Sequence, residues 1–335
     1  MRITRDLLLK LARDTVSSRT RNDRSLLCVY LTGSVLSEEP LLGGTTDIDL
    51  IFVHSDEPYT EREIQRLSDD VHLDIAHYGQ ARFHTPRHLR SDAWLGSFLC
   101  ARPLVLYDVQ HWFDYTQASV FSHFEQPEMV LQRARPLAEA ARQTWFELQT
   151  NPPEHSARAL LQYLRTLEQA ANAIACLSGA PLTERRFWLR FPARAEAIGQ
   201  PELAVSMTTL FQGNEPPSAD DWQTWLPAWS ETLRTAAQQP GAPPRLAAAR
   251  RAYYERAVQA LCNEAPTAAV WIMLRTWALA QASLPDLAPA PAWEALRQTL
   301  GLSEAAFEAR LTALDGLLDQ VESILDDWAR QNGIA

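Results

Sequence analysis

Two aspartates one residue apart, Asp47 and Asp49, open an apolar segment and follow a Gly33-Ser34 pair that ends an earlier one. Side chains alternate between the two faces of a β-strand, so we expect Asp47 and Asp49 on one face and Ile48 on the other. Carboxylates this close repel each other unless a cation lies between them. Oxygen ligands of this kind suit Mg²⁺, which keeps part of its water shell and accepts substrate phosphates as further ligands.

A third acid, Asp74, lies inside another apolar segment, with Leu73 and Ile75 expected on the opposite face. An acid in such a segment is rarely buried without a partner. The Gly33-Ser34 turn offers backbone N–H groups and a hydroxyl to a phosphate. Together these features predict nucleotide chemistry on a divalent metal. The alternative, in which the first two acids only flank a turn before an edge strand, leaves Asp74 unexplained.

The ordered set of Gly-Ser, a loop, Asp-x-Asp on a strand and a third acid on a neighbouring strand resembles the nucleotidyltransferase superfamily related to DNA polymerase beta. The resemblance covers roughly residues 25 to 110. It implies that Asp47 and Asp49 hold the metal that bridges the β- and γ-phosphates of ATP or another nucleoside triphosphate, and also touch a second metal. Asp74 would complete that second site or act as general base, and both roles stay open.

The resemblance also implies roles for residues near the acids. Gly33 would let the backbone approach the phosphates, and Ser34 would donate a hydrogen bond to one of them. Thr46 occupies a position where the family often has serine, so it joins Gly33 and Ser34 as a candidate for nucleotide binding. For Thr45 and Thr46 the alternative is that both only orient or cap the loop.

The net charge, the hydropathy and the cysteines of the chain indicate which partners and which cellular compartment to expect. A net charge of -10 argues against a polynucleotide partner and fits a small, cationic acceptor or a protein. There is no apolar run long enough to span a bilayer and no signal-peptide pattern, so no membrane association is expected. The four cysteines are scattered and form no CxxC pair, which indicates free thiols in a reducing cytoplasm.

Hydrophobic periodicity predicts an α+β chain, with a small mixed sheet that has helices on one side, followed by an all-helical part. In the first part strands are expected at residues 25–32, 47–54, 71–77 and 104–107, and helices at 4–18, 60–70 and 86–100. In the second part helices are expected at 126–150, 156–177, 183–198, 201–211, 219–237, 245–263, 267–283, 292–300 and 303–331, with interruptions at Pro192 and Pro227. The predicted domains are 1–115 and 116–335, with a further boundary considered at 238–244.

The helical domain is expected to close over the nucleotide and to carry the acceptor pocket. Its most suggestive stretch is 158–190, which contains five arginines and two glutamates. Arg165 and Arg186 are candidates for phosphate contacts there, and ion pairs with Glu168 or Glu184 are the alternative.

The favoured function is a metal-dependent nucleotidyltransferase that moves AMP from ATP onto a hydroxyl of a small, aminoglycoside-like molecule and releases pyrophosphate. A second hypothesis keeps the chemistry but makes a protein or a tRNA end the acceptor, as in toxin-silencing minimal nucleotidyltransferases; the long fused helical domain counts against it. A third is an inactive nucleotide-binding regulatory module, against which all three acids argue. The sequence leaves the oligomeric state open.

Overall fold

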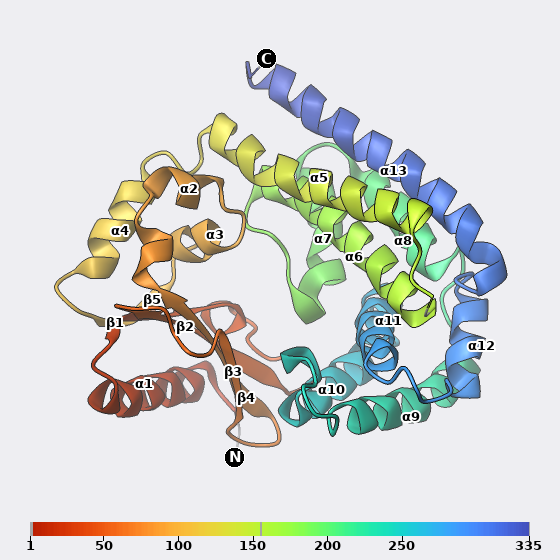
Figure 1. Ribbon diagram of the computed structural model, residues 1–335, viewed down its shortest axis with the longest axis horizontal. Coiled ribbons are helices and arrows are strands. Elements are labelled where there is room, and N and C mark those ends of the chain that lie inside the picture. Colours follow the sequence, from red (N-terminus) through yellow and green to blue (C-terminus); the bar gives the residue numbers. More distant parts are fainter. Residues whose placement is uncertain (1–2, 155, 335) are drawn as a thin grey trace. The chain divides into compact units, whose positions relative to one another are not determined.

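The computed structural model describes residues 3–154 and 156–334, and its chain divides into two compact units between Met129 and Val130. The first unit contains a five-stranded mixed sheet, and the described residues of the second contain helices and no strand (Figure 1). The predicted α+β class, with an all-helical C-terminal part, is confirmed.

The sheet has the strand order β3-β4-β2-β1-β5. Its strands are β1 (Leu26–Thr32), β2 (Thr46–His54), β3 (Arg62–Arg66), β4 (Val71–Gly79) and β5 (Leu104–Asp108). β2 and β4 pair in parallel, and the other neighbours are antiparallel. The three central strands are mostly buried, whereas the edge strands β3 and β5 are half-exposed or exposed.

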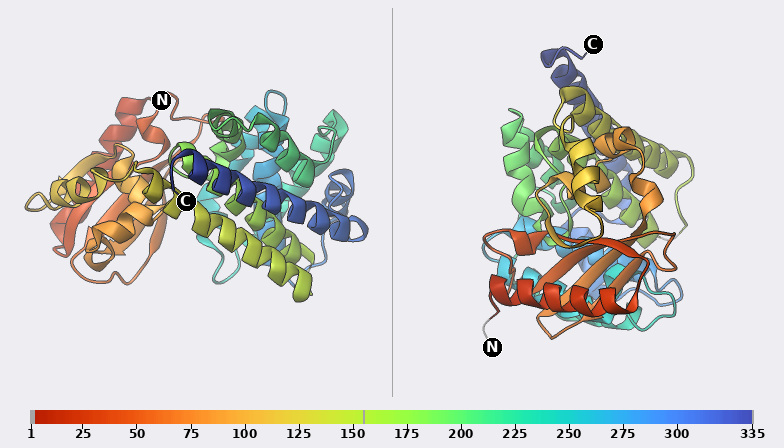
Figure 2. Two further views of the ribbon diagram at one scale, coloured as in Figure 1. Left: turned by 90° about the horizontal axis from the view of Figure 1, so that it is seen from above. Right: turned by 90° about the vertical axis from the view of Figure 1, so that its left-hand side faces the viewer.

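Helices cover both faces of this sheet. Helix α1 (Arg5–Asn22) packs on the face that includes Val29 and Leu31. The opposite face, which includes Cys28 and Tyr30, packs against α2 (Pro86–Ser91), α3 (Leu95–Cys100) and α4 (Trp112–Phe121) (Figures 1 and 2). The expectation of helices on one side is therefore wrong, because β1 and β2 are apolar on both faces and each face needs a cover.

The segment predicted as a helix at 60–70 forms the edge strand β3 and a turn instead. It contains few apolar residues, so a helix here would have no apolar stripe to bury. As a strand, it pairs its backbone with β4, with Ile64 opposite Asp74. The side chain of Ser68 then accepts hydrogen bonds from the N–H groups of Asp70 and Val71, 3.2 and 3.1 Å away, and closes the hairpin.

The helix predicted at 86–100 is two short helices, α2 and α3. Between them Asp92 adopts an extended conformation, and its Oδ1 accepts hydrogen bonds from the N–H groups of Trp94 and Leu95 at 2.8 and 2.7 Å. A side chain that satisfies the first N–H groups of a helix starts a new helix at that point. Helix α4, which the sequence analysis did not predict, packs on α2 and α3 within the first unit.

The second unit consists of helices whose positions follow the predicted ranges closely. They are α5 (Pro127–Thr150), α6 (Ser156–Ala175), α7 (Phe187–Ala197), α8 (Pro201–Gln212), α9 (Ala219–Ala236), α10 (Arg251–Leu261), α11 (Pro266–Ala282), α12 (Pro291–Thr299) and α13 (Glu304–Gln331). Most residues of α6 and α11 are buried, so these two helices form the centre of the unit. Among the residues that the structure describes, no helix is both long and apolar enough to cross a lipid bilayer.

Two prolines that were expected to interrupt helices lie inside them. Pro192 is within α7 and Pro227 is within α9. An internal proline costs a backbone hydrogen bond. The large aromatic side chains that these helices bury, such as Phe191 and Trp229, offset that cost and keep each helix continuous.

Helix α13 runs antiparallel to α5 (Figure 2). Arg142 of α5 forms ion pairs with three acids of α13, at 2.5 Å from Asp315, 2.6 Å from Asp319 and 2.8 Å from Glu322. Trp145 donates a hydrogen bond to the carbonyl of Leu311 at 3.0 Å. These contacts fix the register of the two longest helices of the unit.

Candidate metal centre

The parallel register of β2 and β4 brings the three predicted acids together. Asp49 lies opposite Asp74, and Asp47 lies opposite His72. Each of the three carboxylates offers an oxygen, and these oxygens all lie within 4.8 Å of one another. The three acids point to the sheet face that α2, α3 and α4 cover, because the residues between them belong to the core under α1.

The three acids differ in exposure. Asp47 and Asp74 are buried, whereas Asp49 is half-buried. The Asp47 carboxylate is therefore largely withdrawn from solvent, whereas that of Asp49 is partly accessible. Buried carboxylates that share one site repel each other strongly, and positive charge nearby is the usual compensation.

Gly33 brings the end of β1 against the acid pair. Thr32, the last residue of β1, lies opposite Asp49. Gly33 follows with φ 77° and ψ -156°, a region that is essentially restricted to glycine. A Cβ at this position would lie 2.8 Å from Cγ of Asp49 and closer still to its Oδ2. Only a residue without a side chain lets the Asp49 carboxylate approach this turn.

Ser34, Thr45 and Thr46 make hydrogen bonds at the two ends of the loop before β2. The hydroxyl of Ser34 lies 3.3 Å from that of Thr46, which donates a hydrogen bond to the carbonyl of Pro40 at 2.9 Å. Thr45 donates to the carbonyl of Leu42 at 3.0 Å. Both threonines are buried, and Ser34 is half-buried. These contacts agree with the loop-orienting role; nucleotide binding by Ser34 and Thr46 stays a prediction.

Arg62 is a member of this centre that sequence reasoning missed. Its Nε donates to Oδ1 of Asp74 and its Nη2 donates to Oδ2, both at 2.6 Å. Arg62 is on β3, diagonally across from Asp74, and it was missed because this segment was predicted to be helical. The alternation of polar residues around Ile64, followed by a Ser-Asp-Asp turn, is the signal that could have indicated a strand and hairpin.

The donor set of the three acids fits a hard divalent cation. All the candidate ligand atoms are carboxylate oxygens, which Mg²⁺ and Mn²⁺ prefer over softer donors. The guanidinium of Arg62 supplies one fixed positive charge beside them, less than the charge of three carboxylates. The residues therefore fit the metal that the sequence analysis predicted.

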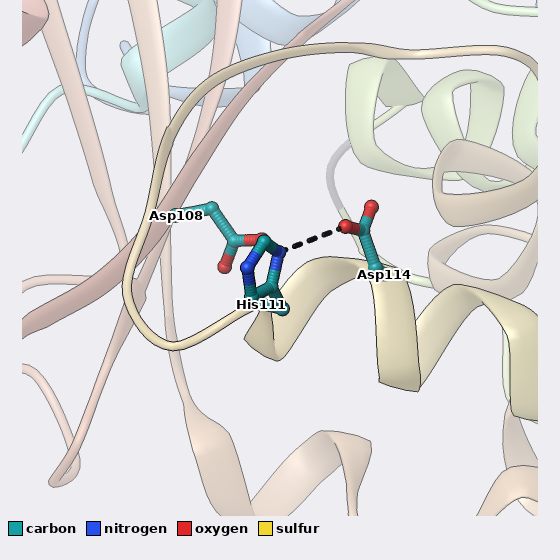
Figure 3. A group of neighbouring side chains, drawn as sticks. All are labelled: Asp108, His111 and Asp114. Atoms are coloured by element: carbon teal, nitrogen blue, oxygen red, sulfur yellow. Dashed lines mark hydrogen bonds and ion pairs between the residues drawn. The ribbon is translucent and has the colours of Figure 1, made fainter.

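A second group with metal-ligating side chains, Asp108, His111 and Asp114, lies at the start of α4 (Figure 3). His111 and Asp114 are exposed, and Nδ1 of His111 lies 3.3 Å from Oδ2 of Asp114. Asp108 accepts a hydrogen bond from the N–H group of Phe113 at 3.0 Å. The Asp108 carboxylate thus satisfies one N–H group in the first turn of α4, and exposed acidic groups such as Asp114 are common without a metal.

A histidine pair lies on the other face of the sheet. Nε2 of His54 on β2 is 3.0 Å from Nδ1 of His77 on β4. The hydroxyl of Ser25 lies 2.9 Å from Nδ1 of His54, and Oε2 of Glu63 lies 3.9 Å from Nε2 of His77. Burial lowers the pKa of both histidines, although Asp23 opposes this for His54 and Glu63 opposes it for His77.

In the helical unit, the two glutamates of the stretch 158–190 pair with arginines from later helices and turns. Glu168 pairs with Arg275 of α11. Oε1 of Glu184 lies 3.0 Å from Arg245 and 3.5 Å from Arg250. These partners differ from Arg165 and Arg186, the two arginines whose positions in the sequence suggest pairing with Glu168 or Glu184. Contacts of those two arginines with phosphate stay predictions.

Searches against models of known protein families and against curated protein sequences gave no match.

Proposed function

We propose that the protein is a metal-dependent nucleotidyltransferase that moves a nucleoside monophosphate, with AMP from ATP favoured, onto a hydroxyl of a small acceptor and releases pyrophosphate. The observation that carries the proposal is the convergence of oxygens from Asp47, Asp49 and Asp74 within 4.8 Å, beside the turn at Gly33 and Ser34. The resemblance of this ordered set to the nucleotidyltransferase superfamily supports the same chemistry.

In this reaction the acceptor hydroxyl gives up its proton to a base, a role that stays open to Asp74. Its oxygen forms a bond to the α-phosphorus, and the bond from that phosphorus to pyrophosphate breaks. Divalent ions held by the three acids would neutralise the triphosphate and stabilise the charge that develops on its oxygens. Gly33 is exposed and has no side chain, so the backbone there is open to a phosphate. Ser34 would donate its hydroxyl to the same group.

The proposal is tested by measuring pyrophosphate release with each of the four common nucleoside triphosphates against a panel of acceptors that includes aminoglycosides. The double variant Asp47→Asn Asp49→Asn should lose turnover by about a hundredfold or more, since the metal contributes several kcal/mol to the transition state. Asparagine is nearly isosteric, which matters because Asp47 is buried. Asp114→Asn, in the exposed group at the start of α4, is the control and should turn over normally.

Two results would contradict the proposal. One is wild-type turnover by the double variant, which would remove these acids from the chemistry. The other is binding of ATP with Mg²⁺ but no pyrophosphate release with any acceptor, which would favour the inactive regulatory module.

A further inference from the structure

We infer that Arg62 is a positioning residue that holds the Asp74 carboxylate and competes with a divalent cation for it. The inference rests on the proposed function for the identity of the metal centre. It starts from the bidentate contact, in which both carboxylate oxygens accept a hydrogen bond at 2.6 Å. The Asp74 side chain is 2% exposed and the Arg62 side chain 42% exposed.

The contact gives one carboxylate two possible cationic partners. A bidentate guanidinium fixes both the position and the plane of a carboxylate. An oxygen of Asp74 nevertheless stays within 4.8 Å of oxygens of Asp47 and Asp49. Asp74 is therefore oriented toward the centre while Arg62 neutralises it from the side of β3.

Electrostatics predicts that Arg62 weakens the binding of a second cation by Asp74. Arginine keeps its charge under all ordinary conditions, so Arg62 is a permanent cation beside the centre. A positive charge at hydrogen-bond distance weakens the attraction of the same carboxylate for another cation. Because the Arg62 side chain is partly exposed, it can withdraw into solvent when a metal takes its place.

The fold of β3 does not explain the contact. β3 is already held by its backbone pairing with β4 and by the Ser68 turn. Arg66, at the other end of β3, lies on the same face and pairs with Asp69 in the turn. Arg66 thus provides a matched control with the same charge on the same strand and no contact with Asp74 among the described interactions.

The test is a titration of the nucleotide-free, full-length protein with Mn²⁺, in which electron paramagnetic resonance measures the free ion. Arg62→Gln should bind Mn²⁺ about tenfold more tightly than the wild type, or bind an additional ion, because a competing positive charge at hydrogen-bond distance from Asp74 has been removed. Arg66→Gln should bind as the wild type does. Arg62→Lys, which keeps the charge and loses the two-pronged contact, should lie between the wild type and Arg62→Gln.

A purely structural role for Arg62 predicts the opposite sign, because a loosened centre binds metal more weakly. Unchanged or weaker Mn²⁺ binding by a folded Arg62→Gln would therefore overturn the inference. If Arg62→Gln does not fold, the Mn²⁺ affinity of Arg62→Lys is the deciding measurement. An affinity no tighter than that of the wild type would then overturn the inference. If Asp47→Asn weakens Mn²⁺ binding while Arg62→Gln changes nothing, only this inference fails. If neither the wild type nor Arg62→Gln binds Mn²⁺, the metal centre of the proposed function fails with it.

Discussion

Gly33 is the residue that joins the turn after β1 to the acids of β2. Its backbone conformation is one that other residues adopt only at a cost of about 1–3 kcal/mol, and a Cβ would press against the Asp49 carboxylate. A side chain at position 33 would therefore have two separate effects. It would strain the backbone, and it would displace the carboxylate of Asp49.

We predict that Gly33→Ala lowers the free energy of unfolding by about 1–3 kcal/mol and also weakens Mn²⁺ binding, because Asp49 must move. Gly44→Ala is the matched control, since Gly44 also has a positive φ of 75° but a Cβ there meets nothing within 4 Å. Urea unfolding followed by circular dichroism measures the free energy of unfolding, and titration with Mn²⁺ measures the affinity of the site for the ion. Equal Mn²⁺ affinity in the two glycine variants would contradict this role for Gly33.

At the scale of elements, the parallel strands β2 and β4 carry a different group of polar side chains on each face of the sheet. One face brings together Asp47, Asp49 and Asp74 near the start of the strands. The other face joins the same strands near their ends through His54 and His77. The histidine contact thus links the two strands on whose register the acids depend, through side chains whose charge changes with pH.

We predict that the protein loses stability as the pH falls below about 6.5, the usual histidine pKa, toward the lowered pKa values of His54 and His77. In this window the unfolded chain binds protons that the folded protein does not, so the free energy of unfolding decreases by up to about 1.4 kcal/mol per pH unit for each histidine. Urea unfolding between pH 7 and pH 5 measures the slope. His77→Gln should make it shallower.

His77→Gln leaves the nearby charged residues Asp23, Glu63 and Arg19 in place. The hydrogen bond from Ser25 lowers the pKa of Asp23, so Asp23 titrates below the range from pH 7 to pH 5. His123→Gln, at an exposed position, serves as the control and should keep the wild-type slope. A slope that His77→Gln leaves unchanged would show that the histidine pair does not control the acid sensitivity.

At the scale of the whole molecule, the net charge favours one kind of acceptor over another for the proposed reaction. The chain has 41 acidic and 31 basic residues. Binding to a nucleic acid depends on dense positive surface that releases counterions from the phosphates. A small cationic acceptor would be attracted to an acidic protein, whereas a tRNA would be repelled.

We predict no measurable binding of tRNA or of a generic RNA oligonucleotide at about 0.15 M ionic strength. Fluorescence anisotropy with labelled RNA is a suitable measurement, repeated at lower salt to detect weak binding. Tight binding whose affinity falls steeply with added salt would favour the hypothesis in which a tRNA end is the acceptor, and would remove the charge argument for a small molecule.

Sequence alone predicted the strands that carry Asp47, Asp49 and Asp74, because their alternation of apolar and acidic residues is a local pattern that one face of a strand explains. It also predicted most of the helices of the second unit, whose apolar periodicity extends over several turns. These segments contain enough apolar residues to determine their own structure wherever they pack.

Tertiary structure decided the rest. Residues 62–66 have little apolar character, so the unpaired edge of β4 determines their conformation, and only that pairing brings Arg62 to Asp74. The two-sided cover of the sheet and the partners of Glu168 and Glu184 likewise depend on segments far away in the chain. Long-range pairing of this kind leaves no periodic pattern in the local sequence. The free energy that stabilises such a segment comes from its contacts with a distant partner and not from its own residues.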